Sequence, residues 1–392
     1  MLCVLVWFST RVGILLLGWQ AAPNFVGDEL ELYESWGQDL LSAGGVDGDS
    51  WQYPPLVAPL LWVSTWSGRM PWSFIALAVA TDAFILGLLI RLRQRGGSWL
   101  GPWFWAVAAV IIGPAIFAKL DIFPAAFALL AIAAASHPIR SGLFAAVGTV
   151  LKVWPAFVLV AVPKDRSLRA IASWGVSTLA ISGLIAAIWP STIDFVTNQS
   201  GRGLEAQSIW AYPFLVARAL GQDVSIAFRF GAFEVDSPSA DWMASLLTVL
   251  LLISIAAGLS LWLTGRFDRV AGAESALLVV LVSLLLSRVL SPQFNVWIVA
   301  LAAILLLQVG RPALVIALMI SASSLITQMT YVVGYENLRD GQALALVLHG
   351  GRIGLLVAAT VMLAVRVART WSRDDPAAPG TSTPAAGRSD SP

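Results

Sequence analysis

The chain has 392 residues, of which 58% are hydrophobic and only 12% are charged, and it includes 18 Trp and 17 Phe. A soluble globular chain has about twice this charged fraction, so the composition excludes an ordinary soluble domain and predicts a polytopic membrane protein. The net charge of +1 gives no electrostatic reason to expect a nucleic-acid partner. One cysteine excludes an internal disulfide and a cysteine metal cluster, and two histidines leave little material for a metal site.

Apolar runs of about 20 residues, the length that crosses a bilayer as a helix, recur from one end of the chain to the other. The first run has no basic segment before it and is interrupted by Arg11, so it indicates an uncleaved transmembrane helix rather than a signal peptide. The sequence predicts an all-α protein with about ten full spans, at residues 2–22, 72–91, 99–118, 122–136, 168–189, 242–264, 271–288, 293–308, 313–331 and 342–366.

The segments between these spans alternate in charge. One set is basic ("RLRQRGG", "HPIR", "PKDRSLR", "GRFDR"), and the positive-inside rule places it in the cytoplasm. The loops at 23–71 and 190–240 then lie outside, and an even number of spans leaves both termini in the cytoplasm. We expect one membrane domain, residues 1–370, and a disordered cytoplasmic tail rich in Pro, Ala and Ser, residues 371–392.

Two charges interrupt the first two spans. Arg11 and Asp82 each lie about ten residues from the cytoplasmic end of their predicted helix. A lone charge at the middle of a bilayer costs at least about 2.5–3.5 kcal/mol. We therefore expect the two residues to pair and to hold the first two spans together, rather than to form a proton relay.

The first outer loop contains seven acids and no Lys or Arg between Gly27 and Leu56. Its stretch "DELELYESWGQDLLSAGG" predicts an amphipathic helix on the outer membrane surface, terminated by Gly44 and Gly45. Asp28 stands at the expected N-cap, with Glu31 three residues later in a box-like arrangement. The predicted apolar face consists of Leu32, Tyr33, Trp36, Leu40 and Leu41.

Two further segments are too short or too broken to span alone. Residues 54–67 contain three prolines and predict a surface or half-buried helix. Residues 140–163 predict two short helices that enter and leave on the cytoplasmic side, broken at Pro155, with Lys152 at the apex.

Five stretches in the same order resemble the motifs of one enzyme family: "GDELELYESWGQDLLSAG…WQYPPL", "KLDIFPAAFALLAI", "GLFAAVGTVLKVWPAFVLV", "GRGLEAQS" and "SRVLSPQFNVW". Together they cover roughly residues 5–365. They resemble the polyprenyl-phosphate-sugar-dependent glycosyltransferases of the GT-C fold, and most closely glycosyltransferase family 87, the bacterial α-mannosyltransferase-like membrane proteins.

The resemblance implies an enzyme of the bacterial plasma membrane with its active site on the outer face. Its reaction would be the metal-independent, inverting transfer of a hexose, typically mannose, from a polyprenyl-phosphate donor to a glycolipid or glycan acceptor. No cofactor is implied beyond the lipid-linked sugar itself, and membrane lipids are the other expected partners. The family's catalytic acid falls on Asp28, with Glu29 and Glu31 as alternatives.

The leaving group of that reaction is a phosphate, which basic side chains near the outer face would bind. Arg288 and Lys119 have an alternative interpretation as anchors at the membrane interface. His349, which shares a helix face with Arg352, has an alternative interpretation as a packing residue. The expected phosphate or substrate ligands are Lys119, Lys152, Arg202, Arg288 and His349. The expected sugar or acceptor contacts are Tyr53, Asp121, Glu205 and Gln293. Asp121 has a second interpretation, as the residue that neutralises Lys119.

Two other functions remain open from the residues alone. A membrane transporter or lipid flippase also uses buried charges and Pro-broken helices. The chain shows no internal repeat, however, and a transporter has no evident need for a charged outer loop of about 30 residues. A non-catalytic membrane scaffold is the third alternative.

Overall fold

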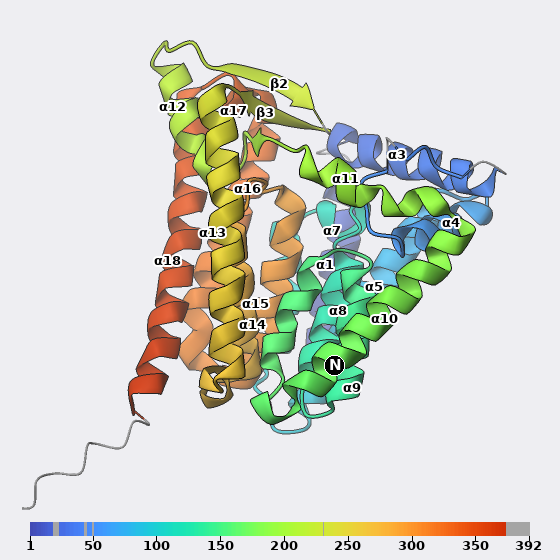
Figure 1. Ribbon diagram of the computed structural model, residues 1–392, viewed down its shortest axis with the longest axis vertical. Helices are drawn as coiled ribbons and strands as arrows, with labels where there is room; N and C mark the ends of the chain where they lie inside the picture. The colour runs from blue at the N-terminus through green and yellow to red at the C-terminus, as the bar shows by residue number, and fades with distance from the viewer. Residues whose placement is uncertain (19–22, 43–44, 49–50, 230, 374–392) are drawn as a thin grey trace, which may run out of the picture.

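The computed structural model describes residues 1–18, 23–42, 45–48, 51–229 and 231–373. Within these residues, six helices are long and apolar enough to cross a membrane, some with the 3-10 turn that precedes them. Those at residues 238–263 and 343–373 run roughly along the long axis of the molecule, and the one at 167–188 runs obliquely to it (Figure 1). These helices are α5 (Trp72–Arg93), α10 (Ser167–Ile188), α13 (Pro238–Leu263), α15 (Asn295–Val309), α16 (Leu314–Val333) and α18 (Ala343–Arg373).

Shorter apolar helices account for the other expected spans. Four of the ten predicted spans correspond to helices of 12–14 residues, fewer than the roughly 20 that a simple crossing requires. In the described residues the structure thus supports a polytopic helical protein with six long candidate spans and does not confirm the expected ten. The shorter helices are α1 (Leu2–Gly13, continued by the π-helical turn η1, Ile14–Gly18), α4 (Val57–Trp66), α6 (Leu100–Ile112), α8 (Ile122–Ala133), α9 (Pro138–Thr149) and α14 (Gly272–Leu285).

Two predicted boundaries are wrong. The expected span 99–118 is interrupted after α6 by Gly113, whose φ of 67° ends the helix, and Pro114 then starts the short helix α7 (Ala115–Ala118). Helix α18 continues to Arg373, so the first residues of the expected tail are helical. The rest of that tail, 374–392, and the expected helix-stop residue Gly44 lie outside the described residues.

The segment 140–163 confirms the prediction of two short helices. Helix α9 ends at Thr149, and the 3-10 helix η2 (Trp154–Ala161) follows, with Lys152 at the break between them. The start of α9 and the end of η2 lie at the same end of the bundle, as the hydrogen bond from Arg166 Nη1 to Ser136 O shows. Residues 57–66 form α4, which is too short to span, as expected.

Hydrogen bonds between loops define two ends of the bundle. At the first, which we call the basic end, hydrogen bonds connect residue 98 with 307, 136 with 166, 164 with 268, and 269 with 371. At the opposite end, the α3 end, α3 (Pro23–Leu41) lies across the bundle beside α11 (Phe195–Ser200) and the strands (Figure 1). The basic-rich segments and the acidic loop therefore occupy opposite ends, as the charge pattern predicts.

The second large loop at the α3 end contains a small sheet that the sequence did not predict. Strand β3 (Ala232–Asp236) pairs antiparallel with β1 (Leu204–Glu205) and β2 (Ser225–Arg229), which corrects the all-α expectation. The short helices α12 (Tyr212–Ala219) and α17 (Tyr335–Arg339) pack beside it.

The acidic-loop helix exists, but it starts earlier than expected. Helix α3 begins at Pro23, so Asp28 lies inside the helix and is not its N-cap. Two members of the predicted apolar face, Leu32 and Leu41, are exposed. The buried face packs against α4 and the loop before it rather than against lipid, and it consists of Leu30, Tyr33, Trp36 and Leu40.

Arg11 and Asp82 are paired, as predicted. Arg11 Nε and Nη2 donate to the two Asp82 carboxylate oxygens at 2.7 and 2.9 Å, and both side chains are at most 3% exposed. Arg11 also donates to the carbonyls of Trp105 and Ala106, and Trp7 Nε1 donates to Asp82. The network therefore joins α1, α5 and α6, and the buried charges are compensated.

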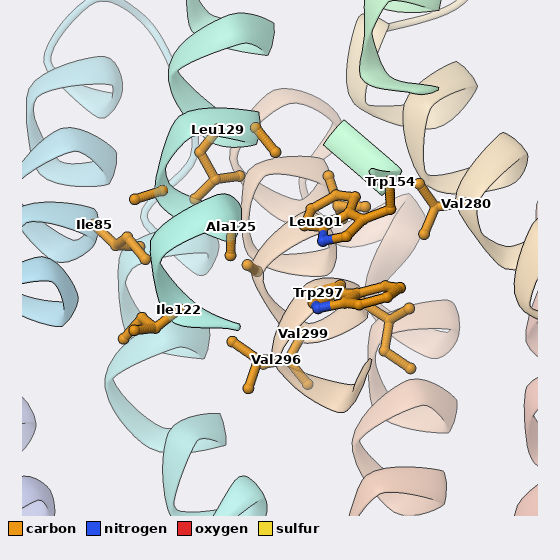
Figure 2. Close-up of a cluster of buried hydrophobic side chains, with 14 of the residues drawn as sticks. Ile85, Ile122, Ala125, Leu129, Trp154, Val280, Val296, Trp297, Val299 and Leu301 are labelled. Atoms are coloured by element: carbon orange, nitrogen blue, oxygen red, sulfur yellow. The ribbon is translucent and has the colours of Figure 1, made fainter. Parts of the chain in front are cut away.

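The centre of the bundle is a continuous apolar core around α8 and α15. Figure 2 shows Ala125 and Leu129 of α8 facing the helix that carries Val296, Trp297 and Leu301. The rings of Trp154 and Trp297 stack in this core, with centroids 5.1 Å apart. Because Trp154 belongs to η2, this contact fixes the chain directly after Lys152.

Candidate active site

The acidic helix α3 and the short helix α7 bring an ion pair together at the α3 end. Glu29 Oε2 accepts a hydrogen bond from Lys119 Nζ at 2.5 Å. Glu29 Oε1 accepts from the hydroxyl of Tyr33 at 2.6 Å and from that of Tyr53 at 3.2 Å. Tyr33 lies one turn after Glu29 on the same helix face, so helical geometry places its hydroxyl beside the carboxylate. Glu29 is thus held by three donors from three separate segments.

Opposing effects set the pKa of Glu29. Burial alone would raise it, but the positive charge of Lys119 and the hydrogen bonds from Lys119 and Tyr33 outweigh burial, and the pKa lies below its usual value. Glu29 is therefore a carboxylate at neutral pH. A carboxylate has about four lone-pair positions. With three donors bound, one position is left for a further donor.

A second ion pair lies next to the first. Lys152 Nζ donates to Asp121 Oδ1 at 2.7 Å, and Trp297 Nε1 donates to the same oxygen at 2.5 Å. The Lys152 ammonium also lies 5.7 Å from the ring centroid of Tyr53 and 5.2 Å from those of Phe294 and Trp297. The two pairs share Tyr53, whose hydroxyl contacts Glu29 and whose ring faces Lys152. We call Glu29, Lys119, Tyr53, Asp121 and Lys152 the carboxylate–lysine cluster.

The pairing of Asp121 corrects one expectation. Asp121 does not neutralise Lys119, two residues away, because the chain turns between them and directs Lys119 toward Glu29. Asp121 is 1% exposed, and its Oδ2 has no hydrogen-bond partner in the described part of the chain.

Two arginines lie beside the cluster. Arg202 Nη2 donates to Gln52 Oε1 at 3.1 Å, directly before Tyr53 in the chain. Arg288 donates to the carbonyl oxygens of Arg202 at 2.8 Å and Gln199 at 3.3 Å. The "GRGLEAQS" and "SRVLSPQ" stretches are therefore packed against each other, although 86 positions separate Arg202 from Arg288.

Glu205 connects the same two stretches. Its carboxylate accepts from the backbone N–H of Leu290 at 2.8 Å and from the Ser291 hydroxyl at 3.2 Å. Burial raises the pKa of Glu205, and this effect exceeds the lowering by the Leu290 N–H and by the charge of Arg202. We infer that Glu205 holds the loop in place, since its two oxygens are directed to loop atoms.

His349 and Arg352 approach this region from α18. Arg352 Nη2 donates to Gln207 O at 2.6 Å, next to the Glu205 loop. Arg352 and Ser291 also line a small internal cavity with room for about one water molecule. His349 is completely buried, and its ring centroid lies 5.6 Å from that of Tyr212. Gln293 is half-buried in the 3-10 turn η7 (Pro292–Phe294).

The remaining expected acids do not join the cluster. Asp28 and Glu31 are exposed on α3, and both point away from the face that carries Glu29. Because successive helix residues are rotated by about 100°, only one of the acids 28, 29 and 31 can point at Lys119. The buried face of α3 determines that this acid is Glu29, which lies one turn before the buried Tyr33 on that face.

Sequence reasoning missed three contributors to the site. The sequence pattern places Tyr33 on the apolar face of the helix, yet its hydroxyl is a donor to Glu29. Phe294 and Trp297 flank Lys152, although the sequence pattern assigns them only to the predicted span 293–308. The spacing of Glu29 and Tyr33, four residues apart on a helix, was the signal that could have identified the first of them.

Comparison with known proteins agrees with the resemblance. The model of glycosyltransferase family 87 matches residues 51–292, more than half of the chain. The matched range contains Lys119, Asp121, Lys152, Arg202 and Arg288, and it stops short of α3 and α18. No curated protein and no solved structure is significantly similar to the chain. The family match, together with the six long apolar helices, shows that the chain is a membrane glycosyltransferase and a member of glycosyltransferase family 87.

Proposed function

We propose that this enzyme transfers a hexose, in the first instance mannose, from a polyprenyl-phosphate donor to a glycolipid or glycan acceptor at the outer face of the membrane. The transfer is inverting, uses no metal ion and follows the GT-C mode of catalysis. The observation that carries the proposal is the carboxylate–lysine cluster, which gathers two acids and two lysines, paired one to one, at the α3 end of a family 87 chain.

Glu29 acts as the base in this proposal. An acceptor hydroxyl oxygen attacks the anomeric carbon of the sugar, the bond from that carbon to the phosphate oxygen breaks, and the phosphate leaves with the electron pair. The hydroxyl proton passes to Glu29. Its remaining lone-pair position would receive the hydroxyl, while the three donors fix the orientation of the carboxylate. Asp28 is the alternative base; it is exposed but is not held in the cluster.

The cations would stabilise the departing phosphate. Lys152 is surrounded by aromatic rings on one side and by Asp121 on the other, so its ammonium is fixed near Tyr53. Arg202, beside Gln52, adds a guanidinium that can bind two phosphate oxygens. Arg288 orients Arg202 through its carbonyl. This arrangement provides charge stabilisation where negative charge develops.

A matched pair of variants tests the base. Purified enzyme in lipid is given polyprenyl-phosphate mannose, other polyprenyl-phosphate hexoses and candidate glycolipid acceptors, and products are identified by mass. Glu29→Gln should lower the single-turnover rate by about 10²–10⁴-fold, because an amide accepts no proton. Asp28→Asn, one position away, should transfer sugar at nearly the normal rate.

Melting curves of both variants accompany the assay, since Glu29→Gln also removes the partner of Lys119. The double variant Glu29→Gln with Lys119→Met removes both charges and should fold while remaining inactive. Normal transfer by Glu29→Gln together with loss in Asp28→Asn would assign the base to Asp28 instead.

The transporter or flippase alternative makes a different prediction in the same vesicles. It requires movement of the lipid-linked sugar between leaflets without formation of a glycosylated product. Broken helices such as α6–α7 and α9–η2 are compatible with such a function. Movement without product would replace the enzymatic proposal.

A further inference from the structure

A groove lies far from the carboxylate–lysine cluster, at the basic end of the bundle. It runs between the start of α16 and the last turns of α18 and has a volume of about 530 Å³. This is within the range of ordinary small-molecule sites. Its walls are Pro312 and Ile316 on one side and Met362, Val365, Arg366, Arg369 and Thr370 on the other.

The lining changes from apolar to basic along the groove. On α18, Met362 and Val365 come first and Arg366 and Arg369 follow one turn nearer to the basic end. The opposite wall is apolar throughout, with Ile316 one turn deeper than Pro312. Met362 and Val365 are 39% and 42% exposed, so this wall is open rather than sealed by protein. The α18 wall therefore matches a ligand with an apolar part toward the middle of the bundle and an anionic part at its end.

Contacts around the groove fix one arginine and leave the other exposed. Arg366 Nε donates to Glu274 Oε1, and Glu274 Oε2 also accepts from the backbone N–H of Ala271. Arg369 is exposed three residues further along α18. The surrounding loops add further positive charge, from Arg266, Arg269 and Arg311 among others. An anion at the mouth of the groove would therefore lie in a positive field.

We propose that this groove binds an anionic phospholipid from the leaflet that surrounds the basic end. The phosphate contacts Arg369 and Arg366, and the beginning of an acyl chain lies over Val365, Met362 and Ile316. Basic pockets between transmembrane helices are a recognised mode of anionic lipid binding. The bound lipid contacts both α16 and α18. Arg352 lies in the other half of α18, nearer to the α3 end. The site is separate from the transfer reaction and uses none of the residues of the carboxylate–lysine cluster.

Lipid binding to the purified full-length protein tests the proposal without an activity assay. Phosphatidylglycerol and phosphatidylcholine of identical acyl chains are titrated in detergent, with melting temperature and native mass spectrometry as readouts. Phosphatidylglycerol should bind and raise the melting temperature, and phosphatidylcholine should not. Arg369→Gln should weaken phosphatidylglycerol binding by roughly fivefold, the effect of one basic residue near a lipid surface.

Two controls make the test specific. Arg140→Gln removes an exposed arginine from α9 at the same end and should leave binding unchanged. Met362→Trp, at an exposed lining residue, should fill the apolar part of the groove and weaken lipid binding with Arg369 intact. Equal weakening by Arg140→Gln would mean that general surface charge attracts the lipid, and it would overturn the proposal. Stabilisation of the same size by inorganic phosphate, or no loss in Arg369→Gln, would also overturn it.

Discussion

At the residue scale, the buried pair of Arg11 and Asp82 shows how a membrane chain tolerates charge. Each carboxylate oxygen of Asp82 accepts from Arg11, and the remaining donors of Arg11 reach two backbone carbonyls of α6 and the hydroxyl of Thr10. No charge is left without compensation in this network. The pair is therefore expected to cost little while intact and much when broken.

We expect Arg11→Ala or Asp82→Ala alone to destabilise the protein by about 3–5 kcal/mol, because each leaves one buried charge unpaired. The double variant should be less harmful than the sum of the two. Melting temperatures of the four proteins in one detergent measure this coupling. The exposed pair Arg229–Asp236, at 3.2 Å, is the control and should couple weakly. Strictly additive effects for the buried pair would contradict the prediction.

The pKa of Glu29 leads to a prediction about pH. Because the pKa lies below the usual value of 4.5, Glu29 stays ionised as pH falls from neutral, and the proposed base is lost only when pH drops through the lowered pKa. The rate of single-turnover transfer should thus not fall between pH 7 and about pH 5. The same ionised form stabilises the fold at neutral pH, and this contribution is lost in acid.

Lys119→Met should raise the pH at which activity begins to fall in acid. The variant removes the charge that lowers the pKa of Glu29 and leaves burial, which raises it, so activity should fall at a higher pH than in the native enzyme. Lys164→Met, at an exposed lysine of the basic end, should leave the profile unchanged. Identical profiles for all three proteins would show that Glu29 does not control the rate.

At the element scale, close helix contacts place the supports of the site. Helix α6 packs against α15, the helix of Trp297, through Gly101. A Cβ at Gly101 would lie 2.6 Å from Ala303 O and 2.7 Å from Leu307 Cβ. The first of these neighbours is backbone and cannot turn away. Glycine is therefore required at this crossing by packing rather than by dihedral freedom.

Gly101→Ala should lower stability by about 1–3 kcal/mol through overpacking. Gly87→Ala in α5 is the matched control, since a Cβ there would have no atom within 4 Å. That change should be neutral or stabilising by up to about 1 kcal/mol, because alanine favours the helix. Melting temperatures of the two variants provide the comparison. A Gly101→Ala protein as stable as the control would show that the α6–α15 contact can relax.

At the scale of the whole molecule, charge separates the two ends of the bundle. The basic loops lie at one end, and the acidic helix with the candidate site lies at the other. Combined with the positive-inside rule, this arrangement predicts that the basic end is cytoplasmic and that the site faces outward.

Reporter fusions test this orientation. A reporter that requires the cytoplasm should be active when fused near Arg93, Arg166, Arg269 or the C-terminus. It should be inactive near Gly48, Asn198 or Asn337, all at the α3 end. Activity at Gly48 would place the candidate site in the cytoplasm and would rule out transfer at the outer face.

The sequence alone determined the features that depend on composition along the chain. Long apolar runs predict helices, because a chain in lipid must satisfy its backbone internally. The alternation of basic and acidic loops predicts which segments share an end. The family resemblance, carried by five short motifs, is confirmed by the family match. The pairing of Arg11 with Asp82 also follows from the sequence, because two lone charges at equal depth leave few other partners.

Only the tertiary structure decided the features that depend on register and on distant partners. The packing of the buried face of α3, which holds Tyr33 and Trp36, turned Glu29 toward the bundle, because Glu29 lies one helical turn before Tyr33. Lys119 and Lys152 could each have paired with Asp121. The packing pairs Asp121 with Lys152, 31 positions away in the chain, and Glu29 with Lys119, 90 positions away. Local sequence carries no signal for such pairings, because the distance between two side chains in space is set by the packing of the helices that bear them.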